Sequence, residues 1–177
     1  MKKVMMTLMA IAFVIVANAQ YNVSTSSHHT DSYGNSISTH RNQFGEITGR
    51  STSYTDCYGN TTTTHRDNYG NTIGRSTTYT DPYGNKITTH RDLYGNTTGR
   101  TRSNTDNYGN TLSTYSDHYG RTIGSSRSAT DNYGKTTTNY SNRYGQSVGS
   151  SRSNTDLYGN TTTQHRRSKS NTTIWTW

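Results

Sequence analysis

Histidine recurs in this chain at a fixed spacing, and imidazole is a common metal ligand and general base. Every 25 residues one column carries an imidazole or a phenol ring; it reads His40, His65, His90, Tyr115, Tyr140 and His165. A ladder of metal ions would need an unbroken column and a second ligand at short spacing. Two tyrosines interrupt this column and no second ligand follows it. We therefore expect solvated strand histidines, with no metal site and no other cofactor.

Aromatic and arginine side chains repeat in the same way and could bind a polymer. An aromatic residue precedes glycine eleven times, at two alternating positions of the repeat. The candidate ligand-facing aromatics are Phe44, Tyr69, Tyr94, Tyr119 and Tyr144, and the candidate basic face consists of Arg50, Arg75, Arg100, Arg127 and Arg152. Such rings could stack on sugars, and the arginines could meet acidic envelope polymers. The alternative is that each ring only covers its own hairpin.

No singular constellation for catalysis stands out, since repetition spreads each polar group over several equivalent positions. Catalysis needs one partly buried cluster with perturbed pKa values. The single cysteine, Cys57, occupies a position that Ser, Pro, Leu, Asn and His fill in other copies. We expect an incidental exposed thiol there, no catalytic residue anywhere, and therefore no enzymatic activity.

A 25-residue repeat must position these columns. Aromatic–glycine pairs begin at intervals of 11 and 14 residues in strict alternation, from Tyr33 to Tyr158. Asp or Asn stands two residues before every one of the eleven aromatics. Five full copies run from residue 30 to 154 and a half copy continues to about residue 166.

The repeated tetrad predicts a chain reversal. A type I turn favours Asp or Asn at its first position, Pro at its second and Gly at its fourth. The turn-defining residues Asp56, Gly59, Asp81, Pro82 and Gly84 follow this pattern, and the only proline occupies the second position. A type I turn followed by a left-handed glycine is a common hairpin connection.

The segments between turns are short and rich in threonine, which is β-branched and suits a pleated sheet. We therefore predict an all-β fold: an antiparallel meander of about twelve short strands joined by type I turns with Gly bulges. One face of the longer strands is almost uniformly Ser, Thr or Gly, and the arginines keep to the other face. The glycine column that includes Gly74 is interpreted as a bulge. A β-solenoid with two strands per coil stays open as an alternative, since like residues would then stack as ladders.

Composition limits the fold and indicates export. After residue 19 only 12 of 158 residues are Ile, Leu, Val or Phe, too few for an ordinary apolar core. Residues 1–19 combine two lysines, an apolar run and small residues near Ala19, which is typical of a cleaved bacterial signal peptide. Removing them leaves 16 Lys and Arg against 10 Asp and Glu, a net charge of +6. The expected order is signal peptide 1–19, polar lead 20–29, repeats 30–166 and C-terminal tail 167–177.

The phrases DCYGNT at 56–61 and DPYGNKI at 81–87 resemble the YD repeats of Rhs-type secreted bacterial proteins. That resemblance implies strand–turn–strand strips and secretion. The chain departs from the pattern because an aromatic precedes each glycine and the spacing alternates. A looser likeness is to curli-type amyloid subunits, although the glutamine ladders of that family are missing.

These observations favour a secreted, non-enzymatic structural or adhesive β-repeat protein at the cell envelope or outside a bacterial cell. A self-assembling, amyloid-like fibre subunit is the alternative, because open sheet edges with few lysines invite edge pairing. A binding module for envelope glycan or another polyanion is a second alternative. The expected partner is envelope polysaccharide or a further copy of the chain; no nucleic acid and no transmembrane segment after signal cleavage are expected.

Overall fold

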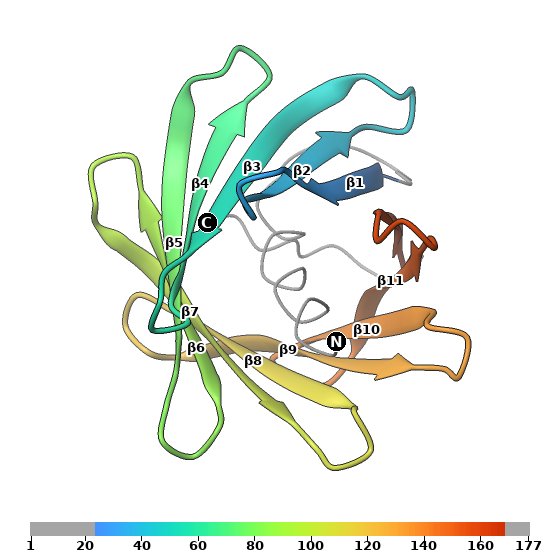
Figure 1. Cartoon of the computed structure of the whole chain (residues 1–177). Helices are drawn as coiled ribbons and strands as arrows, with labels where there is room; N and C mark the ends of the chain where they lie inside the picture. Colours follow the sequence, from blue (N-terminus) through green and yellow to red (C-terminus); the bar gives the residue numbers. More distant parts are fainter. Residues whose placement is uncertain (1–23, 169–177) are drawn as a thin grey trace.

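A computed structural model describes residues 24–168 and contains twelve antiparallel strands in this range. The strands follow one another round a ring in chain order, as Figure 1 shows, and β1 pairs with β12 to close a barrel. Their bounds are β1 Ser24–Thr30, β2 Ser36–Arg41, β3 Ile47–Thr55, β4 Thr61–Asp67, β5 Thr72–Thr80, β6 Lys86–Asp92, β7 Thr97–Thr105, β8 Thr111–Asp117, β9 Thr122–Thr130, β10 Thr136–Asn142, β11 Ser147–Thr155 and β12 Thr161–Arg167. The predicted all-β meander of twelve strands is confirmed. The described part of the chain holds no helix that is long and apolar enough to span a membrane.

All eleven reversals have the predicted turn. In the β5–β6 hairpin the Gly84 N–H donates to the Asp81 carbonyl oxygen at 3.0 Å, and the Asp81 N–H donates to the Asn85 carbonyl oxygen at 2.8 Å. Gly84 has φ of +82°, and the other ten turn glycines also lie in the left-handed region. The Asp81 carboxylate accepts hydrogen bonds from the N–H groups of Tyr83 and Asn85. Asp or Asn is therefore required at the first position because it satisfies the backbone donors of the turn.

A β-bulge in the following long strand lies opposite five rings of the column, those from His40 to Tyr140. In the β4–β5 pair, His65 lies opposite Gly74 but Arg66 lies opposite Thr72, so Ile73 is the extra residue. Equivalent shifts occur in the β2–β3, β6–β7, β8–β9 and β10–β11 pairs. A Cβ atom at Gly74 would lie 2.7 Å from the Arg91 carbonyl oxygen, which explains the glycine. The interpretation of the glycine column as a bulge is confirmed.

Closure into a barrel was not predicted, and it rules out the solenoid alternative for residues 24–168. Most of the expected polar lead forms β1, whose Ser24 lies opposite His165 of β12. Bulges increase the local twist and bend of a strand. Five of them, with a small-residue face turned inward, give the sheet enough curvature to meet itself.

The inside of the barrel is polar. Its most deeply buried side chains are Ser113 and Ser126, with 1% and 2% of their surface exposed. Hydroxyl pairs bridge neighbouring strands across the inner face; they include Ser53 with Thr63 at 2.8 Å and Ser128 with Thr138 at 2.7 Å. Among the described residues only Tyr115 and Tyr140 are buried hydrophobic residues. Buried hydroxyls require hydrogen-bond partners, and this lateral pairing provides them.

Candidate functional site

The repeated histidine column points into the barrel, where it joins a hydrogen-bonded inner belt. This inner belt is defined by strand register, which sets a Ser or Thr opposite each ring; its members are Ser26, His40, Ser51, His65, Ser76, His90, Thr101, Tyr115, Ser126, Tyr140, Ser151 and His165. His65 shows the pattern: its Nδ1 lies 3.0 Å from the Ser51 hydroxyl and its Nε2 lies 2.9 Å from the Ser76 hydroxyl. Ser51 also contacts His40 Nε2 at 3.1 Å, and Ser76 contacts His90 Nδ1 at 2.9 Å. Rings and hydroxyls therefore alternate from strand to strand.

The expectation of solvated histidines is wrong. His40 and His65 expose 7% and 5% of their surface. Desolvation by burial lowers the pKa of His65 from 6.5 to about 4, and the neighbouring His90 and His40 add to this effect. Burial likewise lowers the pKa of His90 and His165 to about 4. Sequence reasoning missed the burial because both faces of these strands are polar, so composition did not indicate which face turns inward.

The inner belt requires neutral imidazoles. Each serine hydroxyl has one hydrogen, so Ser51 can donate to one of its two histidines and must accept from the other. A neutral imidazole offers one N–H donor and one acceptor nitrogen, which lets donation run in one direction along the belt. The arrangement supports structure, and no group of three His, Cys, Asp or Glu residues within 24–168 could hold a metal ion.

Tyrosine replaces histidine in two consecutive short strands of the inner belt. The Tyr115 hydroxyl lies 2.7 Å from the Ser126 hydroxyl, and the Tyr140 hydroxyl lies 3.0 Å from that of Ser151. Burial raises the pKa of both phenols above the usual value of 10. These rings stay neutral over the whole physiological range and fill the same level of the barrel as the histidines.

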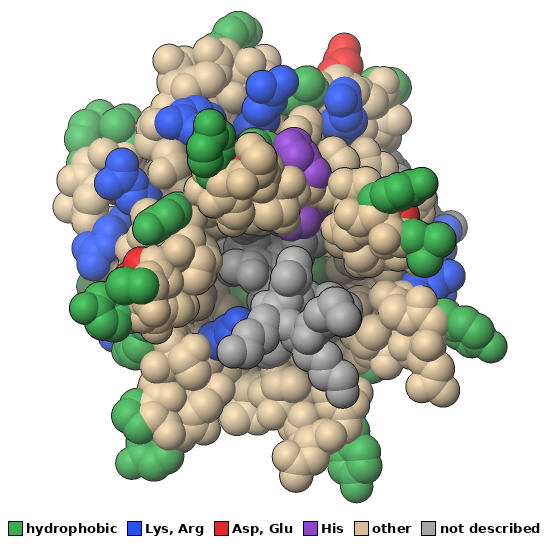
Figure 2. All heavy atoms as spheres, viewed as in Figure 1, with side chains coloured by type: hydrophobic (Ala, Val, Ile, Leu, Met, Phe, Trp, Pro, Cys, Tyr) green, Lys and Arg blue, Asp and Glu red, His purple; other side chains and the backbone are tan. Residues whose placement is uncertain are grey.

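The turn aromatics form two crowns, one at each end of the barrel. The first crown consists of Tyr33, Tyr58, Tyr83, Tyr108, Tyr133 and Tyr158, and the second crown consists of Phe44, Tyr69, Tyr94, Tyr119 and Tyr144. Between 71% and 93% of the surface of each of these residues is exposed. Figure 2 shows hydrophobic side chains at the outer ends of the hairpins. The alternative that each ring covers its own hairpin is therefore wrong.

The second crown, which holds the candidate ligand-facing aromatics, differs along its circumference. Arg121 lies over the Tyr119 ring at 5.0 Å and Arg143 over the Tyr144 ring at 4.6 Å. Within residues 24–168 these are the two cation–π contacts. Within the same range no cation lies over the rings of Phe44, Tyr69 and Tyr94.

The arginines of the predicted basic face are exposed, and Figure 2 shows most Lys and Arg side chains on the outside of the barrel. Register divides it into two parts. Arg50 lies directly opposite Arg66, and Arg75 lies directly opposite Arg91, so two arginines missed by the sequence analysis join the first part. Arg127 and Arg152 lie opposite Leu112, Asn139, Thr137 and Gln164 instead. The five predicted arginines therefore do not form one uniform surface.

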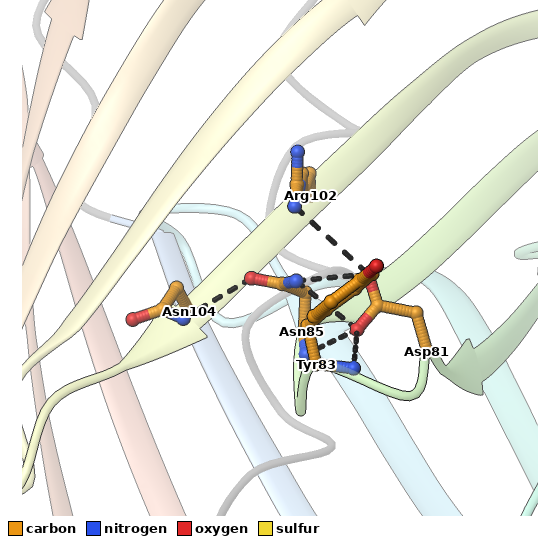
Figure 3. Close-up of polar contacts among 5 residues, drawn as sticks. All are labelled: Asp81, Tyr83, Asn85, Arg102 and Asn104. Carbon is orange, nitrogen blue, oxygen red and sulfur yellow. Dashed lines mark hydrogen bonds and ion pairs between the residues drawn. The ribbon is translucent and has the colours of Figure 1, made fainter.

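Figure 3 shows how one turn contacts the next hairpin. The Asn85 side chain donates to the Asp81 carboxylate at 2.8 Å and accepts from Asn104 Nδ2 at 3.1 Å. Arg102 lies 3.9 Å from the same carboxylate. Desolvation opposes ionisation of Asp81, but hydrogen bonds from Asn85 and Tyr83, together with Arg102, keep the pKa of its carboxyl below the ordinary value. The contact joins two hairpins and has a structural role.

Cys57 is exposed at a turn, as expected. No family model, no curated protein and no solved structure matches the chain. The resemblance to YD repeats and the looser likeness to curli subunits therefore stay predictions. The surfaces that remain as candidates for function are the two crowns and the arginines on the outer face.

Proposed function

We propose that the chain is an extracytoplasmic, non-enzymatic β-repeat protein with a structural or adhesive role in a bacterium. The observation that supports this most directly is the exposure of eleven aromatic side chains on rigid turns at both ends of the barrel. A ring held in solvent by a fixed backbone loses little conformational freedom on binding. An exposed aromatic ring recurs at these positions in every copy of the repeat, which favours a surface that contacts a partner.

Export follows from residues 1–19, which lie outside the described residues. Two lysines, an apolar run and small residues before Gln20 are the parts of a cleaved signal. N-terminal sequencing of the protein recovered from periplasm, cell surface and medium tests this proposal. We expect Gln20 as the first residue, and a cytoplasmic chain that retains Met1 would contradict export.

A non-enzymatic role is proposed because the polar groups of the barrel are repeated and used in mutual hydrogen bonds. The inner belt pairs hydroxyls with neutral rings on successive strands, so none of its groups differs from its equivalents in the way a nucleophile or base would. This proposal also accounts for the absence of singular residues in the sequence pattern.

Substitution of matched sets of crown residues tests the adhesive role. We expect Tyr69→Ser, Tyr94→Ser and Tyr119→Ser together to weaken binding of the purified protein to immobilised envelope glycans. The control carries Tyr58→Ser, Tyr83→Ser and Tyr108→Ser in the first crown, with equal loss of aromatic surface. Unchanged binding of both triple variants to every glycan tested would remove the adhesive version and leave a structural role.

The fibre alternative loses its original motivation in the barrel. It depended on open edge strands, whereas each of the twelve described strands pairs with two neighbours. Assembly of barrels would have to use the crowns end to end. Size-exclusion chromatography of the protein over several days tests this version; growing oligomers that the crown substitutions suppress would support it, and a lasting monomer would end it.

A further inference from the structure

Six arginines form a continuous row on the outside of β2 to β7. This arginine row consists of Arg41, Arg50, Arg66, Arg75, Arg91 and Arg100, one from each of six consecutive strands. Two direct pairs, Arg50 with Arg66 and Arg75 with Arg91, are joined by diagonal neighbours, since Arg75 lies opposite Thr64, two residues before Arg66. Neighbouring strands are about 4.8 Å apart, so the row extends over about 24 Å of the surface.

The arginine row has no acidic partners. All six side chains are exposed, and the two ion pairs found within residues 24–168 involve Arg102 and Arg121, which lie outside the row. Like charges directly opposite each other destabilise a sheet. A surface that places them together at successive strands, without carboxylates between them, is complementary to a chain of anions.

The chemistry of the row favours oxyanions. Every cation in it is arginine, whose planar guanidinium binds carboxylate, sulfate or phosphate through two parallel hydrogen bonds. Outward threonines accompany the row: Thr39 lies opposite Arg50, Thr64 opposite Arg75 and Thr89 opposite Arg100. Their hydroxyls add neutral donors and acceptors at the same level.

Three exposed rings border the row. Arg41, Arg66 and Arg91 each precede a second-crown aromatic by three residues. The Arg41 and Arg91 guanidinium groups donate to the Gly45 and Gly95 carbonyl oxygens of the adjacent turns, at 2.8 and 3.2 Å. Two of the charges are therefore anchored beside Phe44 and Tyr94, and Arg66 precedes Tyr69 at the same spacing; no arginine within residues 24–168 lies over these three rings. Charge and ring surface together suit an acidic sugar polymer, whose pyranose faces and anionic groups alternate.

We propose that the arginine row, with Phe44, Tyr69 and Tyr94, binds a linear acidic polysaccharide that carries about one anionic group per sugar. The choice of a polysaccharide rests on the proposed extracytoplasmic function; the choice of a linear polyanion rests on the row alone. The polymer lies across the strands, follows the outer circumference of the barrel and stacks on the rings of the adjoining turns.

The test measures binding of polygalacturonate, a linear polymer with one carboxylate per sugar, to the purified protein by calorimetry at several salt concentrations. We expect Arg66→Ser with Arg75→Ser to weaken binding about tenfold. The slope of log K against log salt should decrease by about 0.7 for each arginine removed. Serine is the matched replacement because Ser116 and Ser125 occupy the equivalent positions in β8 and β9.

The control variant carries Arg127→Ser with Arg152→Ser, which removes the same charge from the same outer face but not from the row. We expect less than a twofold change in its affinity. Equal weakening by both double variants would overturn the proposal, because it would show attraction to net charge without a site. Tighter binding of poly(dT) than of polygalacturonate would overturn the polysaccharide and favour nucleic acid.

The outcomes separate this inference from the proposed function. A protein that binds neutral envelope glycans through its crowns, but not polygalacturonate, would contradict the arginine row and leave the adhesive role intact. A protein that binds polygalacturonate but is found in the cytoplasm would contradict export and leave the row intact.

Discussion

Ten strands of the barrel form two sectors, which share one backbone and differ in side chains; outside them, β12 carries His165 and Arg166 and repeats the histidine pattern. In the histidine sector, β2 to β7, each short strand has near its end an inward histidine followed by an outward arginine: His40 and Arg41, His65 and Arg66, His90 and Arg91. In the tyrosine sector, β8 to β11, the same places hold Tyr115 and Ser116, and Tyr140 and Ser141. The outward change from arginine to serine thus accompanies the inward change from histidine to tyrosine.

The long strands change in the same way. Arg50, Arg75 and Arg100 follow the bulge glycine in the histidine sector, whereas Ser125 and Ser150 follow it in the tyrosine sector. The six strands of the histidine sector therefore combine a pH-sensitive interior with directly paired surface arginines, and the four strands of the tyrosine sector have neither. The comparison indicates that the paired inner hydroxyls and the turns maintain the fold in both sectors. The residue types of the ring column and of its outward neighbours differ without changing the backbone.

The largest expected difference between the sectors is in acid. An unfolded chain binds protons at histidine near pH 6.5, but folded His65 binds one only near pH 4. The contribution of His65 to the free energy of unfolding should therefore fall as the pH drops from about 6.5 to 4 and stay constant below that. For His65 alone the loss amounts to about 3 kcal/mol. Urea unfolding followed by circular dichroism across this range measures it.

Exchanging the rings between sectors isolates this effect. His65→Tyr should make the acid loss smaller by about 3 kcal/mol, and Tyr115→His should make it larger. The hydrogen bond of the ring to the next long strand exists in both cases, to Ser76 or to Ser126. The turn aspartates lose their contribution to the free energy of unfolding at a lower pH than the histidines do, because hydrogen bonds hold the pKa of carboxyls such as Asp56 below 3.8. Identical pH profiles for both variants and the parent chain would contradict the assignment.

A smaller loss of stability should occur equally in both sectors. A Cβ atom at Gly74 or Gly149 would lie 2.7 Å from the Arg91 or Arg166 carbonyl oxygen. Gly74→Ala and Gly149→Ala should each lower the free energy of unfolding by about 2 kcal/mol, since the opposing backbone must move. The exposed Thr77→Ala serves as control and should cost about 0.5 kcal/mol or less. Loss at Gly74 but not at Gly149 would show that the sectors differ in backbone as well.

The sequence predicted local structure better than closure or burial. Asp81, Pro82 and Gly84 specify their turn within four residues, and Gly74 marks a bulge through its own missing Cβ. Closure depends on the pairing of Ser24 with His165, which are far apart in sequence. The burial of His65 could not be deduced because an inner face of serine and threonine resembles an outer one.

The candidate site was predicted in part for a related reason. Because side chains alternate between the two faces of a strand, the repeat spacing predicted that Arg50 and Arg75 share one face, and the structure places both on the outer surface. The row itself needs the register that sets Arg66 beside Arg50, and that register depends on a turn and a bulge acting together. The crowns could be predicted as two rows, but the exposure of their rings depends on how the hairpins project from a closed barrel.

The smallest expected effect tests whether repulsion within the arginine row lowers the stability of the barrel. Arg75 faces Arg91 directly, whereas Arg152 faces Thr137 and Gln164. Arg75→Thr should therefore raise the free energy of unfolding by about 0.5 kcal/mol relative to Arg152→Thr at low ionic strength. The difference should vanish at about 1 M salt, where the Debye length is near 3 Å. Urea titrations of both variants at the two salt concentrations measure it, and using threonine in both removes any difference in strand propensity. A gain in stability for Arg75→Thr alone would mean that the histidine sector keeps like charges together at a cost in stability, which is expected of a surface that meets an anionic partner. Equal stability of the two variants would mean that the arginines of the row do not repel one another measurably.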